Sequence, residues 1–277
     1  MLGTDVIDIF QTKHTIVECD IHNCDILDAG QLESLVSSSR PDVIIHTAAY
    51  TDVDRAESDE ATALRLNEGG TRNVAVVAKA YRAKVVYIST DYVFDGTGSI
   101  PYTEKDRPHP AGVYGKTKLR GEQQIFDVLG HASDEPEFLI VRIAWLYGRH
   151  GNNFVSAILQ RAQRQDTLRV VNDQIGSPTY TRDVAEAILA LLTHKARGIF
   201  HVTNSGQCTW HDFAKTILEY AQMPQVIVQP ISTAALRRPA PRPAFSVLDT
   251  SKFTATTGQS LRHWKQGLEA YFQELNS

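Results

Sequence analysis

Short apolar runs alternate with longer amphipathic segments through the first half of the chain, and this alternation constrains the fold more than any other feature. The runs with strand character lie at 15–20, 42–49, 84–90 and 138–144, and the helix candidates at about 28–39, 59–82 and 113–130. All of these runs except the first are almost continuously apolar, as strands covered on both faces are. Strand and helix in alternation predict a parallel sheet with right-handed crossovers. We therefore expect an α/β fold with a doubly wound parallel sheet.

Beyond about residue 150 the regular alternation of strand and helix candidates changes, which predicts a smaller α/β unit packed closely on the first. The expected elements are a helix at 152–165, a strand at 168–171, turns at 176–183, a helix at about 182–194, a strand at 199–203, a helix opening at 209–213 and a last helix near 260–275. The segment RRPAPRP (237–243) should be an ordered surface loop, because proline lacks the amide donor that helices and central strands need.

The opening stretch MLGTDVIDIF has the apolar spacing of a helix, with Gly3 at its start. In a dinucleotide-binding fold the first strand enters a glycine-rich loop, and the next helix points its N-terminus at the pyrophosphate. Gly3 resembles the last glycine of that loop, although a lone glycine beside a helix is the alternative. Asp20 follows at the spacing where a carboxylate grips the adenosine ribose. This predicts a Rossmann-like fold.

These features lead us to expect that the first strand and the first two loop glycines, about ten residues, precede Met1. The chain as given should then bind dinucleotide poorly, and upstream residues should restore the binding.

Composition excludes several classes of function. The 277 residues carry a formal net charge of −4, which argues against nucleic-acid binding. No apolar run approaches the roughly 20 residues that span a bilayer, so we expect no membrane partner. Cys19, Cys24 and Cys208 form no CxxC pair, and their odd number suits a reduced, cytoplasmic protein. The ten histidines lack ligand spacing, and we predict no metal site.

The strongest chemical signal is a tyrosine and a lysine four residues apart, Tyr114 and Lys118, which share one face of the expected helix. Thr90 and Asp91 end the preceding strand, at the sheet edge where open α/β folds bind ligands. A chance YxxxK on an exposed helix is the alternative interpretation.

A nearby ammonium favours phenolate, so Lys118 should lower the pKa of Tyr114 from its usual value near 10. A shift of about 3 units corresponds to roughly 4 kcal/mol. Tyr114 could then protonate the alkoxide that forms when a carbonyl is reduced. Lys118 would also hold the nicotinamide ribose, and Thr90 would bond the substrate oxygen. The cofactor, NADPH or NADH, would supply the hydride.

Several longer motifs make this interpretation more specific. They are RPDVIIHTAAYTDVDRAE (40–57), STDYVFDG (89–96), VYGKTKLRGE (113–122), RIAWLYG (142–148), GNNF (151–154), NDQIGSPT (172–179), TWHDFA (209–214) and RPAFSVLDTSKF (242–253). Over essentially its whole length the chain resembles the extended short-chain dehydrogenase/reductase family, in particular the members that complete dTDP-L-rhamnose. The resemblance implies that Thr90, Tyr114 and Lys118 form a catalytic triad, and that the substrate is a dTDP-4-keto-6-deoxyhexose reduced at C4.

The same resemblance implies a domain division and a set of cofactor contacts. Residues 1–149 would form the dinucleotide-binding domain, and 150–277 mainly the substrate-binding domain, with some elements returning to the first sheet. The implied cofactor-binding residues are Gly3, Asp20, Asp25, Ile26, Ala48, Ala49, Tyr50, Tyr114 and Lys118. Instead of contacting the cofactor, Asp25 could cap a helix. Ala48, Ala49 and Tyr50 could likewise be there only for tight packing. For Asn67, a contact in the nucleotide cleft and a structural role are equally plausible interpretations.

The implied substrate contacts are Thr90, Asp91, Trp145, Asn153 and Arg242. The indole of Trp145 offers a flat face to a sugar, with a place in the core as its alternative. Asn152 and Asn153 suit a helix cap equally well. Arg242 suits a diphosphate because a guanidinium fork matches phosphate oxygens. Arg237 and Arg238 are expected to be solvated neighbours.

Two alternatives to this enzyme remain open. One is a non-catalytic regulatory subunit that binds nucleotide sugar or cofactor, and the other is a reductase or epimerase of a different nucleotide sugar. Asp20 favours NADH because a carboxylate repels a 2′-phosphate, but the choice of cofactor stays open. A homodimer is possible.

Overall fold

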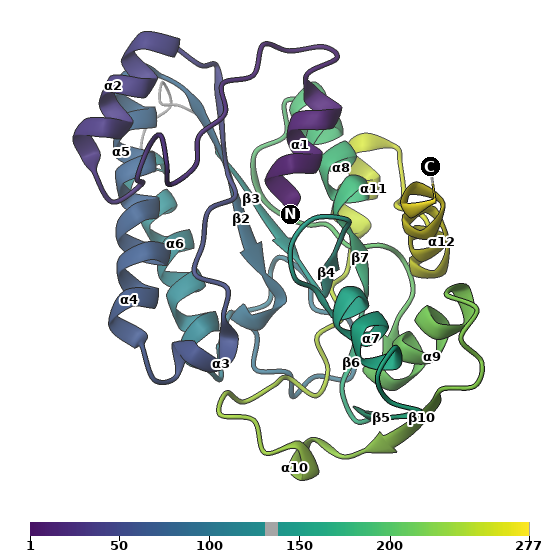
Figure 1. Cartoon of the computed structure of the whole chain (residues 1–277). Coiled ribbons are helices and arrows are strands. Elements are labelled where there is room, and N and C mark those ends of the chain that lie inside the picture. The colour runs from purple at the N-terminus through teal and green to yellow at the C-terminus, as the bar shows by residue number, and fades with distance from the viewer. Residues whose placement is uncertain (131–137, 277) are drawn as a thin grey trace.

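The structure, a computed structural model, describes residues 1–130 and 138–276. Its centre is a four-stranded parallel sheet in the order β1-β2-β3-β8, which confirms the predicted parallel α/β architecture (Figure 1). The strands are β1 (Val43–His46), β2 (Lys84–Thr90), β3 (Phe138–Ile143) and β8 (Gly198–His201).

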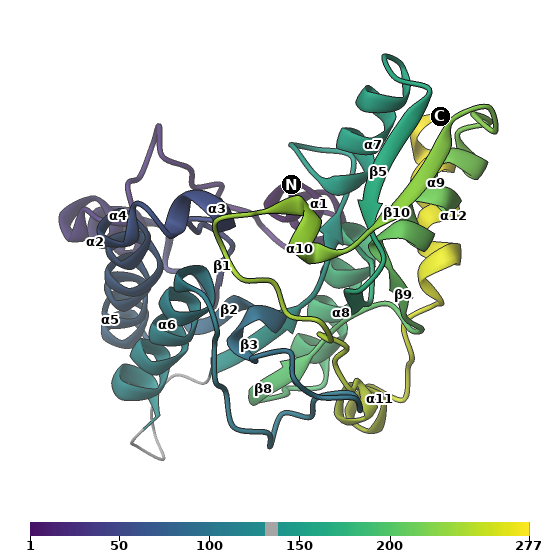
Figure 2. The same ribbon diagram turned by 90° about the horizontal axis from the view of Figure 1, so that it is seen from below.

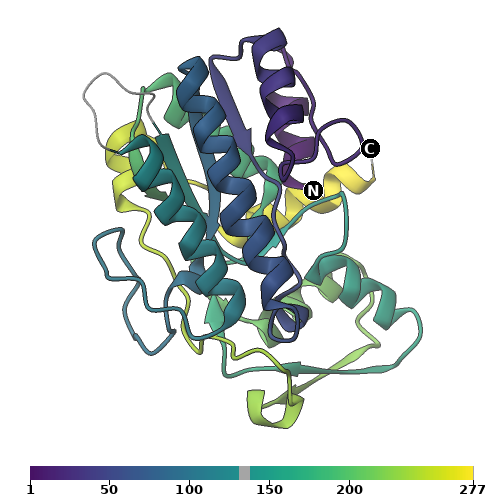
Figure 3. The same cartoon turned by 90° about the vertical axis from the view of Figure 1, so that its left-hand side faces the viewer.

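Helices cover both faces of this sheet, so its strands are apolar on both sides. One face carries α2 (Ala29–Ser39), α5 (Thr71–Tyr81) and α6 (Val113–Leu129), which lie side by side in Figure 3. The other face carries α1 (Leu2–Phe10), α8 (Thr181–Thr193) and α11 (Ser251–Thr257). Along β2, Val85 and Tyr87 pack under the first group, whereas Val86 and Ile88 pack under the second. This is the two-residue alternation of a strand.

The opening residues form the predicted helix α1. Leu2, Val6 and Phe10 are buried in the core that α1 shares with α8.

The predicted helix at 59–82 is instead three consecutive segments. They are α4 (Glu60–Leu64), the π-helical η1 (Arg65–Gly70) and α5. A π turn inserts an extra residue into the helix and redirects the side chains around it. Here it contains the buried Asn67, whose amide bonds the backbone of Tyr50.

The prediction of a strand at 15–20 was wrong, because these residues enter no ladder. A cavity of about 740 Å³ lies between them and the outer edge of β1, and residues of α1, α2 and β1 also line it. Without a partner strand at hydrogen-bonding distance the segment stays irregular, and Val17 is 51% exposed.

The second half forms a smaller lobe beside the sheet, which Figure 2 shows from below. Its elements are β4 (Leu146–Tyr147), α7 (Phe154–Ala162), β5 (Thr167–Val171), β6 (Ile175–Gly176), β7 (Thr179–Tyr180), β9 (Cys208–Thr209), α9 (Trp210–Tyr220), β10 (Ile227–Ile231) and α12 (Trp264–Leu275). Tyr147, Tyr180, Phe213 and Tyr271 pack at its centre. Strand β8 pairs with β3 in the main sheet. As expected, 237–243 is neither helix nor strand.

Several short elements were not predicted. They are the strands β4, β6, β7, β9 and β10, the helices α3 (Val53–Ala56), α10 (Thr233–Leu236) and α11, and the 3-10 turn η2 (Asp91–Val93). No helix in the described ranges has the length and apolar character needed to cross a bilayer.

Candidate active site

The carboxyl end of β2 carries two buried polar residues, Thr90 and Asp91. The Thr90 hydroxyl accepts the Tyr92 amide at 3.2 Å, which starts the η2 turn. The same hydroxyl donates to the Asp91 carboxylate at 3.0 Å. The turn therefore holds both side chains at the strand end.

Two glycines let α6 approach this strand end closely. A Cβ at Gly115 would overlap the carbonyl of Tyr92, and one at Gly121 would lie 2.5 Å from the carbonyl oxygen of Asn67 and overlap the Tyr87 hydroxyl. Larger residues at either position would push the helix off β2 and η2. The close packing is what brings Tyr114 and Lys118 to Thr90 and Asp91.

Tyr114 packs edge-on against Tyr92, with ring centroids 5.6 Å apart. Burial and the negative charge of Asp91 raise the pKa of the Tyr114 phenol above its usual value of 10, although the Thr90 hydroxyl acts to lower it. The predicted acidification of Tyr114 is therefore wrong for this structure, in which the phenol remains a protonated acid at neutral pH.

The reason lies in where the Lys118 ammonium points. Its Nζ donates to the carbonyl of Ile88 at 2.7 Å and lies 4.1 Å from the ring centroid of Tyr87. Lys118 is only 3% exposed, and burial lowers its pKa to about 7, whereas the charge of Glu122 raises it. The lysine is therefore poised between its two protonation states near neutral pH.

Asp91 is the second shifted acid of the site. Burial raises its pKa to about 6, and the hydrogen bond from Thr90 acts to lower it. A carboxyl with such a pKa gains or loses its proton close to physiological pH.

The residues predicted to hold a dinucleotide lie along the ends of β1 and the loop before α2. Gly3 approaches the end of β1 so closely that a Cβ there would be 3.1 Å from Thr47 Oγ1. Ala48 is exposed just beyond it. The Ile26 carbonyl accepts the Asn73 amide at 3.0 Å, which fixes the loop next to α5. Asp20 is exposed and accepts the amide of His22.

Two of the capping alternatives are resolved by the hydrogen bonds. Asp28, and not Asp25, caps α2, while Asp25 accepts the amide of Leu27 in the preceding turn. Asn153 caps α7 by accepting the Ser156 amide, and its Nδ2 donates to Gly148 at 2.8 Å.

Asn67 has a structural role. Its amide bonds both backbone groups of Tyr50 and donates to Thr117 Oγ1 at 2.9 Å, so it ties the loop after β1 to α6. An asparagine inside a helical run was the only sequence signal for this role.

Trp145 follows β3 with a φ of 45°, a strained conformation for a residue of this size. Its ring stacks on that of Trp210, with centroids 3.5 Å apart and planes 8° from parallel. Gly176 lies against its edge, where a Cβ would overlap the indole. Trp145 is thus partly buried in an aromatic stack, and sequence reasoning missed Trp210 as its partner.

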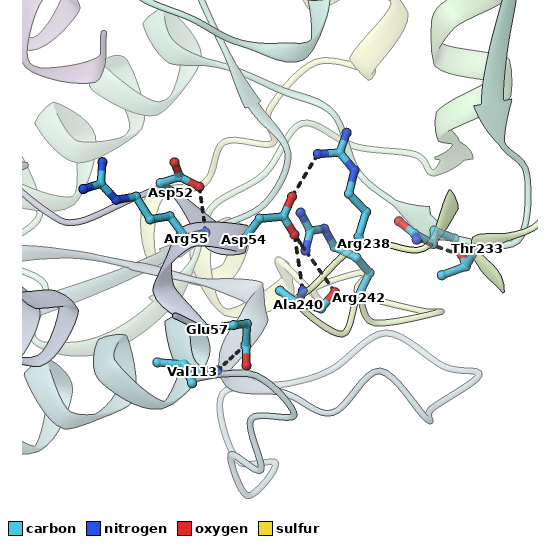
Figure 4. Close-up of polar contacts among 10 residues, drawn as sticks. Asp52, Asp54, Arg55, Glu57, Val113, Thr233, Arg238, Ala240 and Arg242 are labelled. Atoms are coloured by element: carbon cyan, nitrogen blue, oxygen red, sulfur yellow. Dashed lines mark hydrogen bonds and ion pairs between the residues drawn. The ribbon is translucent and has the colours of Figure 1, made fainter. Parts of the chain in front are cut away.

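Asp54 on α3 holds two arginines of the 237–243 loop (Figure 4). Its carboxylate lies 3.0 Å from Arg242 Nη1 and 2.8 Å from Arg238 Nη1, and it also accepts the Ala240 amide at 3.3 Å. Arg238 is exposed, as expected for a solvated neighbour, but its guanidinium also pairs with Asp54, which lies more than 180 positions away in the sequence. Arg237 is exposed, as expected.

The site thus brings Thr90, Asp91, Tyr114 and Lys118 together at the end of β2. Arg242 is near enough to Tyr92 for its charge to act on the pKa of that phenol, so the arginine loop borders the same region. Asp20 and Asn153 contact none of these residues through the hydrogen bonds of the described chain.

Known proteins of similar sequence and structure are dTDP-sugar reductases. The sequence matches the family described as the RmlD substrate binding domain over residues 1–277. It is 41% identical to a dTDP-4-dehydrorhamnose reductase of Streptomyces griseus over 91% of this chain and 83% of that one. It is 37% identical to a dTDP-4-keto-6-deoxy-D-glucose reductase of Streptomyces niveus over 100% and 95% of the two chains. The crystal structure of a dTDP-4-dehydrorhamnose reductase from Bacillus anthracis in complex with NADP superimposes with a TM-score of 0.93 at 39% identity, covering 99% of this chain and 95% of that one.

Proposed function

The chain belongs to the RmlD substrate binding domain family, and from its site we propose that it reduces the C4 ketone of dTDP-4-dehydro-L-rhamnose to give dTDP-L-rhamnose. It is an NAD(P)H-dependent oxidoreductase of a dTDP-4-keto sugar. The observation that carries the residue assignment is the convergence of Thr90, Tyr114 and Lys118 at the carboxyl end of β2.

In the proposed mechanism the nicotinamide, when bound, supplies the hydride that reaches C4. The Tyr114 phenol, kept protonated by burial, donates its proton to the oxygen of the ketone. Thr90 orients that oxygen with its hydroxyl. Lys118, charged below a pKa of about 7, would donate to the nicotinamide ribose beside the phenol and so hold the cofactor at the end of β2.

The residues present fit a dinucleotide. The end of β1 continues into the small residues Ala48 and Ala49, which leave room for a ligand close to the backbone, and Gly3 brings the start of α1 against the same strand end. We propose that these residues, with Ile26, Tyr50 and Asp20, hold the cofactor. Asp25 contributes by shaping the turn that carries Ile26.

We assign the substrate to the opposite side of the strand ends. Asp91 and Trp145 would contact the sugar and Arg242 the diphosphate. Asn153 supports this side as the cap of α7. Residues 1–149 would then serve the cofactor and 150–277 mainly the substrate, with β8 and α8 returning to the main sheet.

The test is a coupled assay with the purified protein. Absorbance at 340 nm should fall only when both a reduced nicotinamide and dTDP-4-dehydro-L-rhamnose are present. Separate runs with NADPH and NADH measure the cofactor preference that Asp20 leaves open. No turnover with either cofactor, while both the reduced nicotinamide and the nucleotide sugar still bind, would instead favour the non-catalytic subunit.

A second substrate is favoured by the relative that aligns with the whole chain, the dTDP-4-keto-6-deoxy-D-glucose reductase. A higher kcat/KM with dTDP-4-keto-6-deoxy-D-glucose than with dTDP-4-dehydro-L-rhamnose would replace our substrate assignment and keep the reaction. We further propose a cytoplasmic protein that forms a homodimer, which light scattering of the purified chain would check.

A further inference from the structure

A buried ion pair lies one helical turn beyond Lys118. Glu122 on α6 and Arg142 on β3 are 2% and 1% exposed. Arg142 Nη2 donates to Glu122 Oε2 at 2.6 Å, and Arg142 Nε donates to Oε1 at 2.9 Å. Ser89 Oγ donates to the same Oε1 at 2.5 Å. The carboxylate is thus fully engaged in the interior, where a lone charge would be costly.

This network joins three parts of the site framework. Glu122 is four residues after Lys118 on α6, and Ser89 directly precedes Thr90 on β2. Arg142 is the β3 neighbour of Ser89 in the sheet register. A displacement of the Glu122 carboxylate would therefore also displace the end of β2, which carries Thr90, and the part of α6 that carries Lys118.

Titratable groups on several neighbouring elements face Lys118, and those on β1 and β2 and the phenol of Tyr114 are uncharged. His46 on β1 is neutral, because burial and the charge of Lys118 lower its pKa to about 3. On β2, Tyr87 offers the face of its ring, and burial raises the pKa of its phenol. On α6, the phenol of Tyr114 is protonated.

Behind Glu122 lie Arg142 and then His201 on β8. His201 is neutral as well, because burial and the Arg142 guanidinium lower its pKa to about 3. Glu122 is therefore the anion whose field favours the charged form of Lys118 within the described chain.

We infer that Glu122 is a positioning residue for the reduction, holding the ammonium of Lys118 charged and the end of β2 in place while Arg142 and Ser89 fix its carboxylate. It touches neither substrate nor cofactor and acts through Lys118. The inference rests on the proposed function, because it concerns the state of Lys118 in that reaction. Nothing in the YxxxK spacing required an acid at the next turn.

The experiment compares the pH dependence of kcat/KM in wild type and in Glu122→Gln, which has nearly the same shape and keeps an oxygen for Ser89. The rate should fall as pH rises through the pKa of Lys118. Without the carboxylate this alkaline limb should move about one unit towards lower pH, with a loss of about tenfold at pH 8 and little loss on the acid side. A loss of equal size at all pH values would show a merely structural role and overturn the inference.

Two further variants keep the test decisive. Asp127→Asn removes one negative charge from an exposed position of the same helix and should leave the limb unmoved. Glu122→Asp keeps the charge and should restore most of the wild-type profile, even if Glu122→Gln folds poorly. An Asp variant whose limb shifts as far as that of the Gln variant would contradict the inference.

A readout independent of turnover separates this inference from the proposed function. The ¹³Cε chemical shift of Lys118, followed by NMR against pH, should titrate lower in Glu122→Gln than in wild type. If wild type reduces no keto sugar, the proposed function fails while this titration still decides the role of Glu122. If wild type is active and the titration is unchanged, only the inference fails.

Discussion

Lys118 and Tyr114 share one face of α6 but have different surroundings, and this difference decides the chemistry of the site. The ammonium is directed to the carbonyl of Ile88, while the phenol lies beside Thr90 and within the field of Asp91. The four-residue spacing was enough to predict that both side chains reach the end of β2. It could not predict the direction of the ammonium or the pKa of the phenol, because both depend on β2 and η2, which are distant in sequence.

Tyr114→Phe tests the proton donor. Removing the hydroxyl leaves the ring and its contact with Tyr92, so the structure should be retained, but the alkoxide loses its acid. We expect kcat to fall by about 10²–10⁴-fold, the range of general acid catalysis, with the Kd for NADPH nearly unchanged. Steady-state kinetics and calorimetric titration measure the two quantities. A kcat within tenfold of wild type would remove Tyr114 from its role.

Asp91→Asn tests how much the buried, ionised carboxylate of Asp91 lowers the free energy of unfolding. The folded pKa, about 6, lies above the ordinary value of 3.8, so the ionised form destabilises the folded protein. The penalty is absent below pH 3.8, grows as pH rises towards 6 and is then constant. The two-unit shift corresponds to about 3 kcal/mol. The variant should therefore be more stable than wild type at pH 7.5, by up to this amount, and equally stable near pH 4.

Urea unfolding at the two pH values measures this difference. Asp127→Asn, an exposed position, should show no such pH-dependent gain. A variant that is less stable than wild type at pH 7.5 would mean that the hydrogen bond from Thr90 outweighs the burial of charge.

At the scale of elements, the sheet strands β1, β2 and β3 were predictable because burial on both faces leaves continuous apolar runs. The failure at 15–20 has a different origin, since a strand needs a partner at hydrogen-bonding distance and the adjacent space is a cavity. The π turn of η1 was also unpredictable from periodicity. It depends on the bonds of Asn67 to Tyr50 and Thr117, which only the folded chain brings together.

Gly121→Ala tests the close contact between α6 and β2. The added methyl group would overlap the Tyr87 hydroxyl and crowd the Asn67 carbonyl, so the helix must shift. Overpacking of this kind costs about 1–3 kcal/mol of unfolding free energy, and the displaced Tyr114 and Lys118 should lower kcat as well. Denaturant unfolding and the 340 nm assay measure the two effects.

Gly69→Ala is the matched control. It also replaces a helical glycine, but a Cβ there meets no atom within 4 Å. Its stability should be equal to or slightly above that of wild type, because alanine restricts the unfolded chain. Similar losses in both variants would show that the contact with Tyr87 is unimportant.

At the scale of the whole molecule, the arginine loop ties its two halves together. Asp54 belongs to the region before β2, whereas Arg238 and Arg242 lie beyond β10 in the smaller lobe. These ion pairs place Arg242, our candidate for the diphosphate, next to the end of the main sheet. The composition predicted a proline-rich loop but not its anchor, because a single carboxylate in a four-residue helix carries no pattern.

Asp54→Asn should loosen this anchor. Hydrogen bonds to charged groups contribute about 1.5–3 kcal/mol each, so the loop should open at least tenfold more often. Trypsin can report this at the Arg237–Arg238 bond, since the bonds after Arg238 and Arg242 precede proline and resist cleavage. We expect about tenfold faster cleavage there. Asp59→Asn, which removes only the weak exposed pair with Arg55, should change nothing.

The stacked rings of Trp145 and Trp210 also have an optical consequence. Two parallel indoles at 3.5 Å couple their electronic transitions, so the pair should produce a split signal in the circular dichroism of the native protein. Any ligand that slides against Trp145, or any movement of α9, would change that coupling. The molecule therefore carries its own reporter beside the proposed sugar position, and occupancy there can be followed by spectroscopy without a label.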